Sequence, residues 1–271
     1  MRTGKKTIKE LIDDIYINEK NYCIEINEHS NNNICAVYFS SNGIYADTEK
    51  DFEYAIIQKN RFEWKNTRIN NAKKSIFLRD INKNFYIDGI NSTINNIDKV
   101  IDFLRKETKG YDIVTIGSSA GGYMAIVAGV LLQAKCVYSF CGILSLRLLY
   151  GQNTFDRFKE GNQKKIIDSK EKNQYYDFIT THMQESNVLI FHFNSQMKMD
   201  IDQAHLTKGH FNIFSFDMKN KNHRYPVYIF NFKDIINYGY DKLRDLSMKY
   251  CDKKISNFKL SVELIGYLKT I

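Results

Sequence analysis

The chain of 271 residues contains only one proline and one tryptophan, and its 14 glycines form no flexible run. Disordered linkers are typically rich in proline, glycine and serine. We therefore expect one domain over residues 1–271. No stretch reaches eighteen uninterrupted apolar residues, so no membrane-spanning helix is predicted. Charges interrupt the basic N-terminal segment before an apolar segment forms, which argues against a secretory signal and for a cytoplasmic protein.

Cysteine is also scarce. The five cysteines are odd in number, form no Cys-x-x-Cys pair and lie mostly in apolar segments. This pattern excludes a disulfide framework and indicates reduced, packed thiols. The chain also lacks the G-x-G-x-x-G and G-K-[ST] spacings of nucleotide-binding loops. We expect neither a cofactor nor a metal ion.

The charge is unbalanced, with 39 lysines and arginines against 31 acidic residues and a formal net charge of +8. The lysines are spread along the chain without a run of five, which indicates a solvated basic surface and not a nucleic-acid-binding patch. A positive surface favours an anionic substrate through long-range attraction. Nothing in the pattern specifies an oligomeric state.

Short apolar segments alternate with helix-length segments along the chain. The expected strands lie within residues 21–28, 33–41, 74–80, 112–117, 135–144, 187–194 and 211–218. A helix is expected after Gly89, with Asn91 or Ser92 as its N-cap. A polar segment at 148–186 predicts a helical insertion, placed where a lid could form, before the strand at 187–194. This order predicts an α/β fold with a mostly parallel central sheet flanked by helices.

The segment from Gly117 to Gly121 reads Gly-Ser-Ser-Ala-Gly and follows a buried strand. In G-x-S-x-G the serine occupies a strained turn between strand and helix, and its neighbours two residues away must be small because strand and helix nearly collide. The following helix directs free N–H groups at the site. We predict Ser119 as a nucleophile. The alternative is a glycine-rich turn that only permits close packing.

A serine hydroxyl needs a base, and His223 lies in a polar loop after a C-terminal strand, where side chains converge on a site. His192 lies inside a strand and is expected to be a packed core imidazole. Asp200 and Asp202 follow the preceding strand and are both candidates for the acid, although either is also a common first-turn residue of a helix. The resulting chain order is serine, aspartate, histidine.

An oxyanion hole requires the N–H group after the nucleophile, that of Ala120, and a second donor from an early loop. The segment Phe-Ser-Ser-Asn-Gly from Phe39 offers Ser40 and Ser41. Its alternative interpretation is a simple turn.

Over residues 35–230 the sequence resembles the α/β-hydrolase superfamily, and more narrowly bacterial serine hydrolases encoded among surface-polysaccharide and glycosylation genes. Three segments carry the likeness: FLRDINKNFYIDGI from Phe77, VTIGSSAGGYMAI from Val114, and the pair FNSQMKMDIDQAHL and NHRYP. The resemblance implies the α/β-hydrolase fold and favours Asp200 over Asp202 as the acid. A departure occurs after Phe140, where Cys141-Gly142 replaces the proline-containing turn of many relatives.

The predicted chemistry is an acyl-enzyme on Ser119. Transfer to water gives an esterase or deacylase, and transfer to a sugar hydroxyl gives an O-acyltransferase; the same three residues serve both. The resemblance and the basic charge suggest an acylated carbohydrate or glycolipid precursor as substrate, including an anionic one. A function of a different class is that of a catalytically silent domain that binds a glycan or a partner protein. The presence of all three residues, Ser119, an aspartate and His223, argues against it.

Overall fold

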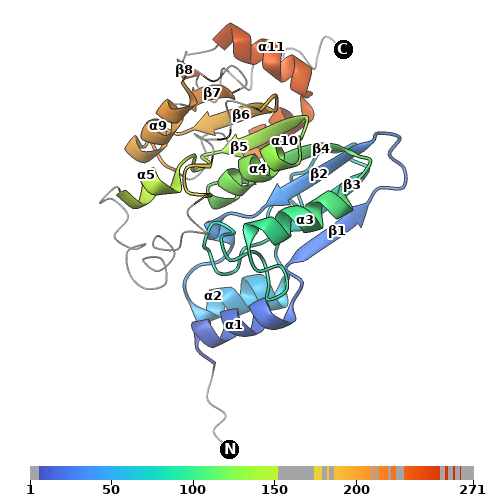
Figure 1. The fold of residues 1–271 in the computed structure, drawn as a ribbon, viewed down its shortest axis with the longest axis vertical. Coiled ribbons are helices and arrows are strands. Elements are labelled where there is room, and N and C mark those ends of the chain that lie inside the picture. The colour runs from blue at the N-terminus through green and yellow to red at the C-terminus, as the bar shows by residue number, and fades with distance from the viewer. Residues whose placement is uncertain are drawn as a thin grey trace, which may run out of the picture.

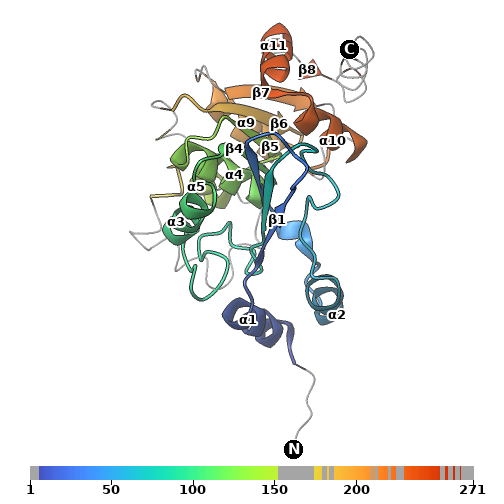
Figure 2. The same cartoon turned by 90° about the vertical axis from the view of Figure 1, so that its right-hand side faces the viewer.

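The computed structural model describes residues 6–151, 174–178, 182, 186–208, 210, 213–218, 221–223, 229–250, 254–255, 259 and 263. In this described part, eight strands form one sheet, with helices packed on both faces (Figures 1 and 2). The strands are β1 (Tyr22–Ile26), β2 (Ile34–Phe39), β3 (Lys74–Leu78), β4 (Asp112–Ser118), β5 (Cys136–Phe140), β6 (Leu189–Asn194), β7 (Ile213–Met218) and β8 (Lys254–Ile255).

The strand order is β1-β3-β2-β4-β5-β6-β7-β8. β1 runs antiparallel to β3, and the other neighbouring pairs are parallel. The mostly parallel sheet predicted from the sequence is therefore confirmed. β8 is a two-residue strand at the edge of the sheet that was not predicted.

The helices in the described residues follow in chain order. They are α1 (Ile8–Asn18), η1 (Asn42–Ile44), α2 (Glu49–Phe52), η2 (Glu53–Gln58), α3 (Ile97–Glu107), α4 (Ala120–Leu131), α5 (Leu146–Gly151), α9 (Lys198–Ala204), η5 (His205–Thr207), α10 (Ile229–Asn237) and α11 (Tyr240–Tyr250). Among them, none has the length and apolar character needed to cross a bilayer.

Each face of the sheet has its own core. Helices α3, α4 and α5 lie on one face of the sheet, and α10 and α11 lie on the other (Figure 2). Their buried side chains belong to two separate hydrophobic clusters. α1 and α2 pack together through Leu11 and Phe52 at the N-terminal end of the molecule (Figure 1). Strands β2, β4 and β5 are thus buried on both sides, which explains why their sequences read as nearly continuous apolar runs.

The expected cap of the helix after Gly89 was wrong. α3 begins at Ile97, and its N-cap is Asn96, whose side chain accepts a hydrogen bond from the Lys99 N–H at 2.8 Å. Asn91 instead accepts the Ile94 N–H at 2.8 Å, within a turn that precedes the helix.

Most of the predicted insertion at 148–186 lies outside the described residues, including the whole of 152–173. Its described flanks belong to the core: Tyr175, Tyr176 and Phe178 are buried. The Tyr123 hydroxyl of α4 donates to the Tyr175 carbonyl at 2.5 Å. The predicted lid therefore stays a prediction.

Candidate active site

Ser119 lies at the turn between β4 and α4, in the middle of the sheet. Its backbone has φ 52° and ψ −118°, a conformation that non-glycine residues rarely adopt and that costs about 1–3 kcal/mol. Its N–H donates to the Phe140 carbonyl at 2.9 Å, and its carbonyl accepts the Tyr123 N–H at 3.1 Å. The turn is therefore held by both the next strand and the first turn of α4.

The glycines around Ser119 are required by close backbone contacts. A Cβ atom on Gly117 would lie 2.1 Å from the Gly121 carbonyl oxygen, and one on Gly121 would lie 2.2 Å from the Phe39 carbonyl oxygen. A Cβ on Gly122 would lie 2.7 Å from the Cα of Gly142. The near collision of strand and helix that the G-x-S-x-G spacing implies is thus present in the structure.

His223 links Ser119 to Asp200. Its Nε2 lies 2.9 Å from Ser119 Oγ, and its Nδ1 lies 2.8 Å from Asp200 Oδ1. With the ring proton on Nδ1, His223 donates to Asp200 and accepts from the Ser119 hydroxyl. The His223 side chain is 25% exposed and that of Asp200 only 2%. The arrangement resembles a nucleophile, a base and a buried orienting acid.

Asp200 lies in the first turn of α9, immediately after the loop that leaves β6. Burial alone would raise its pKa, but hydrogen bonds from His223 and from the Ser195 hydroxyl outweigh burial and lower the pKa of Asp200 below its ordinary value. Asp202 points elsewhere and forms an ion pair with Lys198 at 2.9 Å. The structure thus brings Asp200, and not Asp202, to His223.

Cys141 also reaches this group, which the sequence analysis did not foresee. It follows β5 with φ 47°, is 3% exposed, and donates its N–H to the Phe193 carbonyl of β6 at 2.7 Å. Burial and the neighbouring Asp200 carboxylate raise the pKa of the Cys141 thiol well above its ordinary value. The available signal was its position directly after a strand.

His192 lies on β6 and is 1% exposed, as its position inside a strand predicts. Its Nδ1 is 3.4 Å from Ser139 Oγ on β5. Burial lowers the pKa of His192 to about 4, although the nearby Asp200 carboxylate opposes this effect. His192 is therefore neutral at neutral pH and acts as a core residue.

The Ala120 N–H, one predicted donor of the oxyanion hole, lies at the N-terminus of α4. Ala120 is the first residue of α4, so its N–H has no carbonyl partner within the helix. The other candidates are engaged: the Ser40 N–H donates to the Leu78 carbonyl at 3.0 Å, and the Ser41 N–H donates to Glu63 Oε2 at 2.6 Å. A backbone N–H donor from Ser40 or Ser41 therefore requires a change in one of these bonds.

Glu63 is held by Ser41 through a second bond as well, because the Ser41 hydroxyl donates to Glu63 Oε1 at 2.8 Å. Burial raises the pKa of Glu63, and the two bonds from Ser41 oppose that rise. Sequence reasoning missed Glu63 because it lies in an irregular segment, 22 residues from Ser41.

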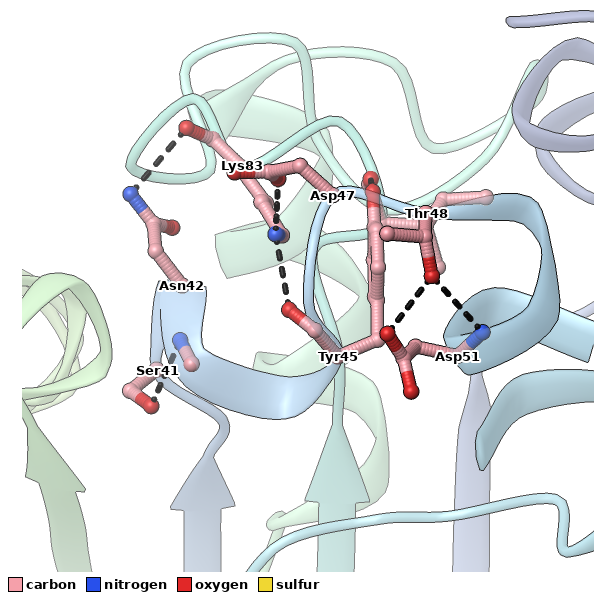
Figure 3. Close-up of polar contacts among 9 residues, drawn as sticks. Ser41, Asn42, Tyr45, Asp47, Thr48, Asp51 and Lys83 are labelled. Carbon is pink, nitrogen blue, oxygen red and sulfur yellow. Dashed lines mark hydrogen bonds and ion pairs between the residues drawn. The ribbon is translucent and has the colours of Figure 1, made fainter. Parts of the chain in front are cut away.

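The loop after β2 that contains Ser41 is also fixed from its far side (Figure 3). The Lys83 ammonium donates to the Tyr45 carbonyl at 2.8 Å and to Asp47 at 2.7 Å, and the Asn42 side chain donates to the Lys83 carbonyl at 3.1 Å. The Lys83 ammonium also lies 3.9 Å from the centre of the Tyr45 ring. These contacts hold the loop in one conformation.

A cavity of about 310 Å³ lies beside Ser118, the neighbour of Ser119. Its lining combines aromatic and charged side chains: Arg61, Phe62, Glu63, Trp64, Lys65 and Phe232. The indole N–H of Trp64 donates to the Phe39 carbonyl at 3.2 Å, and its ring packs against Phe232 at 5.6 Å between centroids. The chain's one tryptophan is therefore fixed at the wall of this cavity.

No protein-family model matches the chain, and no curated protein matches its sequence. Solved structures do share its fold. The capsule O-acetyltransferase of Neisseria meningitidis serogroup A superposes with a TM-score of 0.53 at 10% identity, covering 84% of this chain and 92% of that one. A Staphylococcus aureus protein of unknown function gives 0.50 at 12% identity, over 84% of this chain and 94% of that one.

The acylaminoacyl peptidase of Pyrococcus horikoshii is similar as well, with a TM-score of 0.51 at 12% identity. The match covers 83% of this chain but only 41% of the peptidase. At these identities the similarity concerns the arrangement of strands and helices, and it leaves the chemistry to be argued from the residues of the site.

Proposed function

We propose that this chain, which has the α/β-hydrolase fold, is a serine hydrolase that forms an acyl-enzyme on Ser119. The observation that carries the proposal is the pair of hydrogen bonds from Ser119 through His223 to the buried Asp200. Serine catalysis needs a nucleophile at a strained turn before a helix and a histidine that a buried carboxylate orients, and a chance cluster of polar residues would not be expected to combine these features.

In the proposed mechanism, Ser119 Oγ attacks the carbonyl carbon of an ester while His223 Nε2 takes the hydroxyl proton. Asp200 holds the ring with its proton on Nδ1 and stabilises the imidazolium that forms. His223 then passes its proton to the leaving alcohol. The developing oxyanion is placed next to the Ala120 N–H and the positive end of α4. Water, activated by His223, hydrolyses the acyl-enzyme.

The proposed substrate is an acylated carbohydrate or glycolipid precursor. The cavity beside Ser118 supports this class, because its volume of about 310 Å³ lies within the usual size of small-molecule sites. Trp64 and Phe232 offer rings for the apolar face of a sugar, and Arg61 and Lys65 place positive charge at the same cavity, which favours an anionic group.

We place the reaction in the cytoplasm, because the cysteines within the described residues are free thiols.

An O-acyltransferase is the second candidate. It uses the same three residues, and the capsule O-acetyltransferase of N. meningitidis shares the fold. The two reactions differ only in whether water or a sugar hydroxyl attacks the acyl-enzyme. Access of a sugar to the cavity beside Ser118 favours transfer, and access of water alone favours hydrolysis.

The test is product analysis after incubation with O-acetylated monosaccharides and with an acetylated aryl ester, each with and without free sugars as acceptors. Acetate release that requires Ser119 supports hydrolysis, and an acetylated acceptor that requires Ser119 supports transfer. If wild-type protein with intact secondary structure yields neither product and Ser119→Ala behaves identically, the chain is a silent binding domain and the proposal is wrong.

A further inference from the structure

Three side chains with metal-binding atoms lie close together next to the candidate nucleophile, on the side of His223 that faces Asp200. The Sγ of Cys141, a carboxylate oxygen of Asp200 and a ring nitrogen of His223 all lie within 4.8 Å of one another. They come from three different segments: the end of β5, the first turn of α9 and the loop after β7. Within the described residues this is the one such group of three.

We infer that Cys141, Asp200 and His223 form a binding site for Zn²⁺ that switches the catalytic base off. One thiolate, one carboxylate and one imidazole are typical zinc ligands, and three protein ligands with an open fourth position form a common zinc geometry. Tetrahedral bonds of about 2.0–2.3 Å place ligand atoms about 3.3–3.8 Å apart, which the observed group reaches with small movements. The effect on catalysis rests on the proposed function; the binding itself does not.

The charges and the access also fit a divalent cation. Cys141 and Asp200 are 3% and 2% exposed, and a thiolate and a carboxylate together cancel the two positive charges of zinc. The bound cluster is then neutral, which limits the cost of keeping charge in a buried position. The His223 side chain is 25% exposed, so the ion enters from the solvent side and keeps a water or an anion as its fourth ligand.

Binding would change which atom of His223 carries the proton. The Cys141 thiol releases its proton to solvent, and Zn²⁺ takes the place of the proton on Nδ1. The neutral ring keeps its one proton on Nε2, the atom that lies 2.9 Å from Ser119 Oγ. An imidazole protonated there donates to Ser119 and cannot accept the serine proton. Zinc therefore blocks activation of the nucleophile without touching it.

The experiment is equilibrium dialysis of the full chain against ZnCl₂, comparing wild type, Cys141→Ser and Cys141→Ala. Cys136→Ala is the matched control, because Cys136 is a buried cysteine at the start of β5, the strand that Cys141 follows. We expect one zinc per chain for wild type and Cys136→Ala, and at least a tenfold weaker affinity for both Cys141 variants. Circular dichroism confirms that each variant is folded, and the serine variant keeps the size of the side chain.

A second readout uses Co²⁺, whose bond to a thiolate gives a charge-transfer band in the near ultraviolet. We expect the band in wild type and its loss in Cys141→Ser. In a separate arm, ZnCl₂ slows fluorophosphonate labelling of wild type and of Cys136→Ala but not of Cys141→Ser. Equal zinc affinity in wild type and Cys141→Ser overturns the site. If wild type never labels, the proposed function fails while the dialysis still decides the metal site.

Discussion

The carboxylate of Asp200 lies 2.8 Å from Nδ1 of His223, although Asp200 is almost completely buried. The burial would favour a protonated acid, but the pKa of Asp200 is held below its ordinary value of about 4 by His223 and Ser195. The acid is therefore ionised at neutral pH, as an orienting partner of a catalytic histidine must be. Two residues along, Asp202 pairs with Lys198.

This difference predicts unequal effects of two matched substitutions. Asp200→Asn removes the charge that fixes the tautomer of His223, and we expect a fall in kcat of about 10³–10⁴-fold. Asp202→Asn weakens the ion pair with Lys198, which does not involve His223, and we expect less than a twofold change. Ester hydrolysis by the two purified variants is the measurement. A larger loss in Asp202→Asn would show that the acid was assigned to the wrong residue.

The glycines of the turn predict a second contrast. A methyl group on Gly121 would meet the Phe39 carbonyl at 2.2 Å, whereas one on Gly110 has nothing within 4 Å. Gly110→Ala therefore costs only the backbone strain of its φ of +84°, about 1–2 kcal/mol. We expect Gly121→Ala to lose clearly more stability in urea denaturation, or not to fold. Equal midpoints for the two variants would contradict the close contact of α4 with the end of β2.

The bond between Ser41 and Glu63 predicts a gain of activity. Glu63→Gln removes a negative charge and one of the two acceptors that hold Ser41, which frees a donor of Ser41 for its predicted role in the oxyanion hole. Since one oxyanion donor is worth about 10²–10³ in kcat, partial release should raise the labelling rate by up to about tenfold. The rate of reaction with a fluorophosphonate, compared with wild type, is the measurement.

A fall of tenfold or more in Glu63→Gln would mean the opposite, namely that Glu63 holds a hole that is already formed. Lys83→Met separates the two cases. It loosens the same loop at Tyr45 and Asp47 and leaves Glu63 in place. If anchoring is what matters, both variants slow; if release of Ser41 matters, only Glu63→Gln accelerates.

His192 predicts a pH dependence of stability. In the unfolded chain its imidazole takes up a proton near pH 6.5, but in the folded chain only near pH 4. Between these values the unfolded state binds more protons, so the unfolding free energy falls as the pH falls. The effect of this single group amounts to about 3 kcal/mol across the window.

His192→Gln removes that titration. We expect the stability difference between wild type and His192→Gln to shift in favour of the variant by about 3 kcal/mol from pH 7 to pH 4. Urea unfolding at several pH values gives this difference, and other titrating groups cancel in the comparison. A difference that does not change with pH would show that the folded protein admits the charged imidazole.

The strained turn at Ser119 could be predicted because its steric reason lies within five consecutive residues. Gly117 lies against the Gly121 carbonyl within the motif itself, whereas the contact of Gly121 with Phe39 depends on the neighbouring strand β2. The roles of His223 and Asp200 could also be predicted from the sequence, since residues that follow parallel strands gather at one edge of the sheet.

Contacts that depend on the conformation of irregular segments could not be predicted from the sequence. Glu63 reaches Ser41 from an irregular segment between η2 and β3, where no hydrophobic period indicates a direction. Cys141 approaches Asp200 only because β5 pairs with β6 and because its backbone adopts a positive φ. Asn96, and not Asn91, caps α3 because a turn intervenes, and several asparagines in one segment offer equally good caps.

The most direct measurement is intact-protein mass spectrometry after exposure to a fluorophosphonate, with Ser119→Ala and Ser118→Ala beside wild type. The two serines are neighbours, but only Ser119 has its hydroxyl 2.9 Å from His223. We expect a single adduct on wild type and on Ser118→Ala, and none on Ser119→Ala. An adduct that persists in Ser119→Ala, or a folded wild type that never reacts, would contradict an activated serine at this turn.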